Sequence, residues 1–208
     1  IRDPEMSRGL GDVYKRQHRM LATPKTNDGR YYFHPILMMH AATQYGKTYS
    51  EFMNDYHILV ESNMKLLEMY DHDAVSVISD PNRETAAFGA KITFDGDSSP
   101  KADKLITCME DVEKLEIPDV YACPRTLDRI NGVKLFREKL GVPFPIIGWV
   151  EGPLAECADL CGISELMMNM IMEPDMVKAL QQKCLQMAKN FALSLIHISE
   201  PTRHLRIS

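Results

Sequence analysis

The 208-residue sequence has few cysteines, no long apolar run and no concentration of basic residues. Its five cysteines form no CxxC pair, which argues against a disulfide framework and favours a reducing, cytoplasmic location. No apolar run reaches the roughly 18 residues that span a bilayer. The formal net charge of −5 and the lack of a basic cluster argue against a nucleic-acid surface. The composition, 45% hydrophobic and 25% charged, is ordinary for a globular enzyme or binding domain.

The two ends of the sequence are related to each other at the level of DNA. Residues 7–17, SRGLGDVYKRQ, can be encoded by a string whose reverse complement encodes, in frame, residues 193–203, LSLIHISEPTR. Unrelated protein segments have no reason to share this relation, whereas a sequencing adapter ligated in both orientations produces it. We therefore expect residues 1–17 and 193–208 to be adapter-derived and to make no specific contacts. Residues 18–192 are then the native part, an internal piece of a longer protein.

Between these ends, short apolar runs alternate with helical patterns. Strands are predicted at 34–42, 73–80 and 143–150, with a smaller one at 90–94. Helical patterns cover 49–70, 84–89, 110–115, 125–140, 154–161, 164–172 and 174–192. Strands separated by helices predict an α/β fold with a parallel sheet.

The most informative segment is Pro145-Ile-Ile-Gly-Trp-Val-Glu151-Gly-Pro153, where an apolar run stops and a helix begins. The run is typical of a buried parallel strand, and Pro is well tolerated in the first turn of a helix. Asp80 follows the run 73–79 in the same way. Polar residues at the carboxyl ends of barrel strands hold the chemistry of (β/α)8 enzymes, so Asp80 and Glu151 are expected to face one surface.

In order and spacing, several segments resemble the N-terminal half of the uroporphyrinogen decarboxylase (URO-D) superfamily. The first is the apolar run that begins at Pro35. The second is Val77-Ile-Ser-Asp80, followed by Glu84 and residues 88–94, and the third is residues 147–153. Further along the sequence, Gly162, Leu166, Pro174 and Val177 also fit the family pattern. The resemblance implies a partial (β/α)8 TIM barrel with about three parallel strands over residues 18–192. The superfamily contains decarboxylases and cobalamin-dependent methyltransferases.

Departures from the decarboxylase pattern distinguish these two branches. The decarboxylases carry Arg-Gln-Ala-Gly-Arg near the first strand, and its arginines pair with the acidic substrate through bidentate contacts. Here the stretch reads His40-Ala-Ala-Thr-Gln44, and Asp159 stands where the decarboxylases place a tyrosine after the third-strand motif. The methyltransferases resemble residues 148–153 more closely. The sequence therefore favours the methyltransferase branch.

The resemblance to that branch implies transfer of a methyl group from a corrinoid to a thiol or related acceptor. A zinc ion held by a His-x-Cys pair and a later Cys activates the thiol. The resemblance places these ligands in the C-terminal half of the full-length protein, beyond this chain. No His-x-Cys occurs here, so no metal ligand is assigned, and this chain alone is expected to be inactive. The expected partners are a corrinoid protein or free methylcobalamin and a small thiol, with neither nucleic acid nor membrane. Two alternatives remain: uroporphyrinogen decarboxylation in porphyrin biosynthesis, and a non-catalytic corrinoid- or partner-binding barrel.

The candidate catalytic residues are Asp80 and Glu151, and His40 and Trp149 join them as candidate contacts to substrate or cofactor. Each has a structural alternative. Asp80 also suits a cap on the turn at Pro81. Glu151 also suits a salt bridge with a neighbouring loop, and a lone histidine such as His40 is often a structural hydrogen-bond partner.

Two further pairs of residues are expected to be structural. Arg83 and Glu84 are expected to form a solvated pair near the barrel mouth. Cys157 and Cys161 lie one helical turn apart with no histidine near them in the sequence, which favours buried packing over metal binding.

Overall fold

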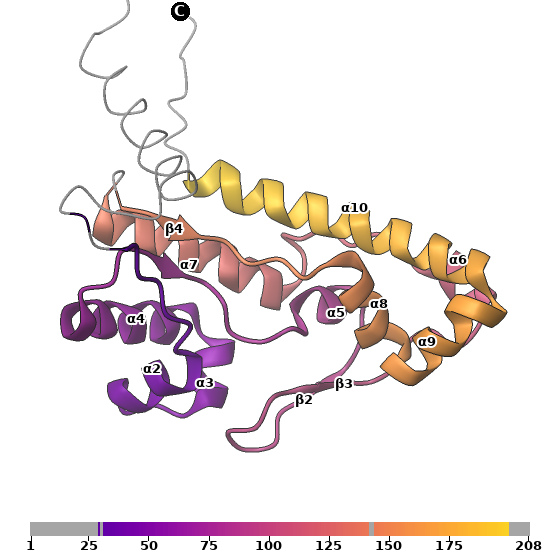
Figure 1. The fold of residues 1–208 in the computed structure, drawn as a ribbon, viewed down its shortest axis with the longest axis horizontal. Helices are drawn as coiled ribbons and strands as arrows, with labels where there is room; N and C mark the ends of the chain where they lie inside the picture. Colours follow the sequence, from indigo (N-terminus) through magenta and orange to yellow (C-terminus); the bar gives the residue numbers. More distant parts are fainter. Residues whose placement is uncertain (1–28, 30, 142–143, 200–208) are drawn as a thin grey trace, which may run out of the picture.

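The computed structural model describes residue 29 and residues 31–141 and 144–199, with side chains described as far as residue 196 (Figure 1). Most of this part is helical, and four two-residue strands are assigned in it. The helices are α2 (Met38–Tyr45), α3 (Tyr49–Asn54), α4 (Tyr56–Tyr70), α5 (Arg83–Ala87), α6 (Met109–Lys114), α7 (Pro124–Leu140), α8 (Pro153–Cys161), α9 (Ile163–Met172) and α10 (Pro174–Ser199). The strands are β1 (Val75–Ser76), β2 (Ile92–Thr93), β3 (Lys101–Ala102) and β4 (Ile146–Ile147). Among the described residues, no helix has both the length and the apolar character to span a membrane.

The expected parallel pairing of the second and third predicted strands is confirmed. β1 pairs with β4 in parallel, with Val75 opposite Ile146 and Ser76 opposite Ile147. The backbone N–H of Val77 extends the ladder by donating to the Ile147 carbonyl at 3.2 Å. Both residues of β1 are buried, as expected for a strand of a parallel sheet that helices cover.

The prediction of a first strand at 35–40 is wrong, because the chain forms α2 from Met38 onward. An apolar run of this length fits a buried strand or a buried helix equally well. Ala41 and Ala42 are fully buried on the side of α2 that packs against α4, and Ala and Met favour helix. Gly46 ends the helix at a φ of 76°, a left-handed conformation that glycine adopts without strain.

The predicted helix at 49–70 is two helices that meet at Asp55. Thr48 and Glu51 form a capping box at the start of α3, and Asp55 caps α4 by accepting from the His57 N–H at 2.8 Å. The strand predicted at 90–94 is confirmed as β2. Its antiparallel partner β3, which the sequence pattern did not indicate, forms a hairpin with it.

Two hydrophobic clusters make up the core, and α10 contributes to both. Cys184 and Leu180 of α10 pack with α6, α8 and α9 in one cluster. Met187 and Phe191 pack in the other with α2, α4, α7 and the β1–β4 pair. Figure 1 shows α10 running along the long axis of the molecule, so this helix joins the two parts.

Residues 193–208 are expected to form coil or a helix extension with few contacts; the helix extension is present, but Leu195 packs more closely than expected. The helix α10 continues to Ser199, and Leu195 is buried in the hydrophobic cluster around β1 and β4. Its Cδ1 atom would lie 3.1 Å from a Cβ atom built on Gly148, so glycine permits this close contact. Residues 1–17 and 200–208 lie outside the described residues, and the adapter origin of both ends stays a prediction.

Candidate functional site

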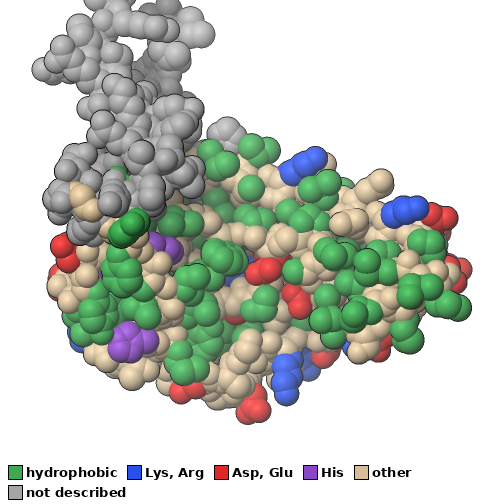
Figure 2. Space-filling view, in the orientation of Figure 1, with side chains coloured by type: hydrophobic (Ala, Val, Ile, Leu, Met, Phe, Trp, Pro, Cys, Tyr) green, Lys and Arg blue, Asp and Glu red, His purple; other side chains and the backbone are tan. Residues whose placement is uncertain are grey.

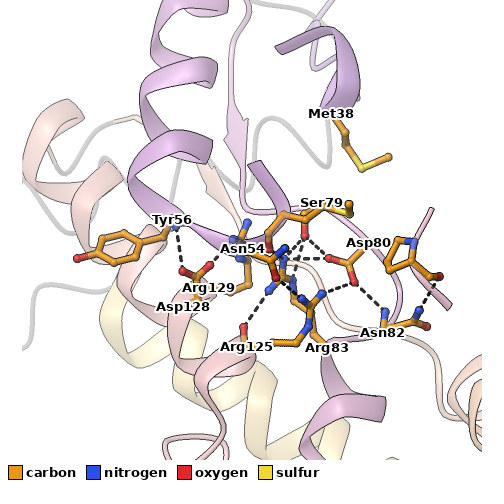
Figure 3. A network of polar contacts seen from close by, with 12 residues as sticks. Met38, Asn54, Tyr56, Ser79, Asp80, Asn82, Arg83, Arg125, Asp128 and Arg129 are labelled. Atoms are coloured by element: carbon orange, nitrogen blue, oxygen red, sulfur yellow. Dashed lines mark hydrogen bonds and ion pairs between the residues drawn. The ribbon is translucent and has the colours of Figure 1, made fainter. Parts of the chain in front are cut away.

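The loop after β1 is fixed by a network of polar contacts around Asp80 (Figure 3). The Asp80 side chain is fully buried, with Arg83 Nη2 at 3.0 Å and Arg125 Nη2 at 2.7 Å. Ser79 Oγ donates to the same carboxylate at 2.8 Å, and the backbone N–H of Asn82 donates at 3.1 Å. The Asn82 contact caps the turn at Pro81, which is the structural alternative for Asp80.

Two opposing effects set the ionisation of Asp80. Burial alone would raise the pKa of this carboxyl group, but Arg83 and then Arg125 hold the pKa below its usual value. Arg83 also donates to the Arg125 carbonyl at 2.9 Å and to the Met53 carbonyl at 2.8 Å. Burial, and then Arg129, lower the pKa of Arg83, yet a guanidinium stays protonated in proteins. Asp80 is thus a buried anion held by two cations.

A third arginine extends the network into α7. Arg129 is 1% exposed and pairs with the neighbouring Asp128, whose Oδ1 accepts from the Tyr56 N–H at 2.9 Å. The Nε and Nη1 atoms of Arg129 have no hydrogen-bond partner among the described residues. The network joins the start of α4, the β1 loop, α5 and α7, so its first role is to position the loop after β1.

The expected solvated pair of Arg83 and Glu84 is wrong, because both residues are buried. Arg83 points into the Asp80 network, whereas Glu84 Oε1 accepts from the Glu151 N–H at 2.9 Å. Most charged residues are exposed, which is the basis of the prediction of a surface pair. Here Arg83 binds Asp80, and Glu84 accepts a hydrogen bond from the loop after β4.

The loop after β4 carries Trp149 and Glu151 side by side. Trp149 Nε1 donates to Glu151 Oε1 at 3.2 Å. Ser76 of β1 lies opposite Ile147 of β4. Asp80 comes four residues after Ser76, and Glu151 comes four residues after Ile147. Both carboxylates follow the carboxyl ends of parallel strands, but they do not share one exposed surface, because the Asp80 side chain is fully buried between Arg83 and Arg125. Glu151 instead contacts α5, where its N–H donates to Glu84.

Four carboxyl groups gather around α5 and α8, and we call Glu84, Glu151, Glu156 and Asp159 the acidic cluster. Burial raises the pKa of Glu84 to about 7. The hydrogen bond from the Glu151 N–H opposes this rise, whereas the charge of the Glu151 carboxylate adds to it. Burial, and then the Glu84 charge, raise the pKa of Glu156 to about 9. Burial, and then Glu151, raise the pKa of Asp159 to about 6. Acidic side chains are visible near the centre of the face in Figure 2.

The acidic cluster has no ion-paired cation in the part of the chain that the structure describes, although the Arg83 charge opposes the rise in the pKa of Glu84. None of its four carboxyl groups forms an ion pair there, so the expected salt bridge of Glu151 with a neighbouring loop is not found among these residues. Both carboxyl oxygens of Glu156 are buried without a hydrogen-bond partner. Thr85 Oγ1 is close enough to influence the Glu156 carboxyl, yet it also lacks a partner within hydrogen-bond distance. Glu156 therefore keeps its proton at neutral pH, and Glu84 keeps its proton in part.

His40 lies apart from Glu151 and Trp149. It is exposed on α2, and its Nε2 atom is 2.9 Å from the Tyr70 hydroxyl, the structural hydrogen bond that was its alternative. It borders an open hollow of about 300 Å³ lined by residues 36–40 and Tyr49. Tyr49 donates to the Ser79 carbonyl, so this hollow adjoins the Asp80 network rather than the acidic cluster.

The packing interpretation of the cysteine pair is confirmed. Cys157 and Cys161 are buried in the cluster that α8 shares with α10, where Cys157 Sγ lies 3.7 Å from Cys184 Sγ. Across the described ranges, no group of three or more His, Cys, Asp or Glu side chains could hold a metal ion.

Sequence reasoning missed Glu156 and Arg125 and misjudged the role of Glu84. Glu156 lies on the buried side of α8, one position before Cys157 and four before Leu160, and this spacing was available in the sequence. Asp159 was noticed only as a departure from the family pattern. Arg125 lies 45 residues from Asp80, so no local pattern could pair them.

Comparison with known proteins identifies the family. Residues 32–198 match the family described as uroporphyrinogen decarboxylase (URO-D). The chain belongs to this family. Uroporphyrinogen decarboxylases of Yersinia enterocolitica and Yersinia pestis are each 31% identical to it over 130 residues, which cover 57% of this chain and 36% of those proteins. The chain thus spans well under two thirds of the curated relatives it matches.

A solved structure supports the fold. A methyltransferase from Methanosarcina mazei superposes with a TM-score of 0.71 at 19% identity, covering 78% of this chain and 49% of that protein. The predicted URO-D resemblance is therefore confirmed. The URO-D superfamily is built on a TIM barrel, and the described residues contain one parallel strand pair of the kind a barrel uses.

Proposed function

We propose that this chain is part of a corrinoid-dependent methyltransferase of the URO-D family, which transfers a methyl group to a thiol or related acceptor. The observation that carries the proposal is the charge at the carboxyl ends of β1 and β4. The loop after β4 and α8 present carboxyl groups there, whereas the neighbouring arginines, Arg83 and Arg125, are bound to Asp80.

These charges disfavour a polycarboxylate substrate. Uroporphyrinogen carries several carboxylates, each of which needs a cationic or hydrogen-bonding partner. A charge-assisted hydrogen bond contributes roughly 1.5–3 kcal/mol, so the loss of several partners is costly. Residues 40–44 offer no arginine, and Asp159 adds a carboxyl group where the decarboxylases have a tyrosine. A solved structure that shares this fold, at 19% identity, is a methyltransferase from Methanosarcina mazei.

Uroporphyrinogen decarboxylation is the second candidate, favoured by the 31% identity to the Yersinia decarboxylases. Asp80 is retained at the expected place, but its side chain is fully enclosed by Ser79, Arg83 and Arg125. Direct contact between Asp80 and a substrate would require one of these contacts to open.

The residues present do not fit the zinc site that the family branch implies. The buried Cys157, Cys161 and Cys184 pack between helices, and no histidine joins them in the described residues. We therefore assign no step to zinc or corrinoid in this chain. Its contribution to the proposed reaction is the mouth formed by Trp149, Glu151 and Asp159, which would orient the substrate.

Expression of the complete gene, with both activities measured side by side, tests the proposal. Loss of the methylcobalamin absorbance in the presence of a small thiol is expected, with no conversion of uroporphyrinogen to coproporphyrinogen. The 208-residue chain, tested in parallel, is expected to be inactive. Efficient uroporphyrinogen conversion without zinc or corrinoid would refute the methyltransferase assignment and leave the family membership intact.

A further inference from the structure

The acidic cluster contains one carboxyl group with an unusual environment. Glu156 is 2% exposed, and neither of its oxygens has a hydrogen-bond partner. Thr85, also fully buried, presents a second unpartnered oxygen from α5. Buried polar groups nearly always have partners, because an unpartnered one costs roughly 1–3 kcal/mol. The Thr85 hydroxyl is near enough to lower the pKa of Glu156, but no full hydrogen bond joins the two groups, so both keep hydrogen-bonding capacity that a ligand would use.

The sign and size of the ligand follow from the surrounding groups. The titratable groups that influence Glu156 are Glu84 from α5 and Asp159 and Cys157 from α8, and Cys184 of α10 faces Cys157. None of these is cationic, so a positive ligand would relieve their repulsion. A metal ion needs three or more donors converging on one point, and the described residues offer no such group.

An aromatic ring lies beside the carboxyl groups. Trp149 is 39% exposed, and its indole N–H holds Glu151 at 3.2 Å. An indole face attracts organic cations, and an ammonium group can donate hydrogen bonds to several carboxylates that are too far apart for a metal. We propose that the acidic cluster, together with Trp149, binds an organic ammonium group.

The ammonium site does not depend on the proposed methyl transfer. Binding of the cation favours the ionised carboxylates, so Glu156 releases its proton to solvent as the ligand enters. The affinity should therefore rise with pH over the range in which Asp159, Glu84 and finally Glu156 lose their protons.

Trp149 is the only tryptophan of the 208-residue chain, so its indole N–H signal in NMR reports on the site without ambiguity. The probe is methylammonium chloride in phosphate buffer, with potassium chloride and magnesium chloride titrated at matched ionic strength. A saturable shift of the Trp149 signal is expected with methylammonium alone, with an affinity at least fivefold higher at pH 8.5 than at pH 6.5.

Three variants assign the binding to the cluster. At pH 8.5, Glu156→Gln is expected to weaken methylammonium binding at least tenfold, and Asp159→Asn at least threefold. Glu68→Gln, the same change at an exposed position of α4, is expected to leave the affinity unchanged. Asp159 is half-buried, so its variant tests the site even if Glu156→Gln does not fold. An equal shift with potassium or magnesium, no saturable shift, or unchanged affinity in both cluster variants would overturn the proposal.

Discussion

Replacing Asp80 by Asn is expected to lower the free energy of unfolding by about 3–5 kcal/mol, because it leaves the buried Arg83 and the partly buried Arg125 without their anion. The Asp80 side chain is fully buried between Arg83 and Arg125, and the side chain of Arg83 is only 5% exposed. Urea unfolding of the 208-residue chain, followed by circular dichroism, measures the change.

Asp175→Asn is the matched control for this experiment. Asp175 also pairs with a cation three residues later, Lys178, but both side chains are more than two thirds exposed. Removal of a surface pair is expected to change stability by less than about 0.5 kcal/mol. Equal effects of the Asp80 and Asp175 variants would mean that the buried network does not stabilise the fold.

The effect of Asp80 also has a defined pH dependence. The folded-state pKa of Asp80 lies below the unfolded value of 3.8, so the unfolded chain binds the proton first as the pH falls. The stabilisation by Asp80 is therefore present above that value and is lost as the pH drops through the folded-state pKa. The difference between wild type and Asp80→Asn should shrink only in strong acid.

The parallel strand pair and most of the helices could be predicted from the sequence because their signals are local. β1 and β4 lie in short apolar runs, and Pro153 marks the start of α8. The segment at 35–40 could not be assigned in this way, since its run of apolar residues suits either structure. The packing of α2 against α4 stabilises the helical form of this segment, and such tertiary packing is not visible in a local sequence pattern.

The positions of the site residues were predictable, but their ionisation states were not. Asp80 and Glu151 follow the expected strands, because the ends of parallel strands meet at one edge of a sheet. Whether a carboxylate meets a cation depends on residues distant in sequence. Asp80 meets Arg125 across 45 positions, whereas Glu156 meets Glu84 and no cation. Burial and distant partners therefore separate a structural aspartate from a proton-holding glutamate.

Glu156→Gln is expected to make the chain more resistant to unfolding at neutral and alkaline pH. The folded state raises the pKa of Glu156 from 4.5 to about 9, chiefly through burial and then through Glu84. Between these values the folded chain keeps a proton that the unfolded chain has lost, so Glu156 makes the folded state less stable as the pH rises. Glu84, whose pKa is about 7, acts in the same direction over a narrower range.

Gln is close in shape to a protonated Glu and cannot ionise, so the variant lacks the Glu156 part of this pH dependence. Each pH unit between the two pKa values changes the free energy of unfolding by about 1.4 kcal/mol. Between pH 5 and pH 7.5, the stability of wild type relative to Glu156→Gln should therefore fall by about 3 kcal/mol. Urea unfolding at several pH values, with Glu68→Gln as the exposed control, measures this difference. Parallel pH profiles of wild type and Glu156→Gln would show that Glu156 is ionised in the folded chain and already has a partner for its charge.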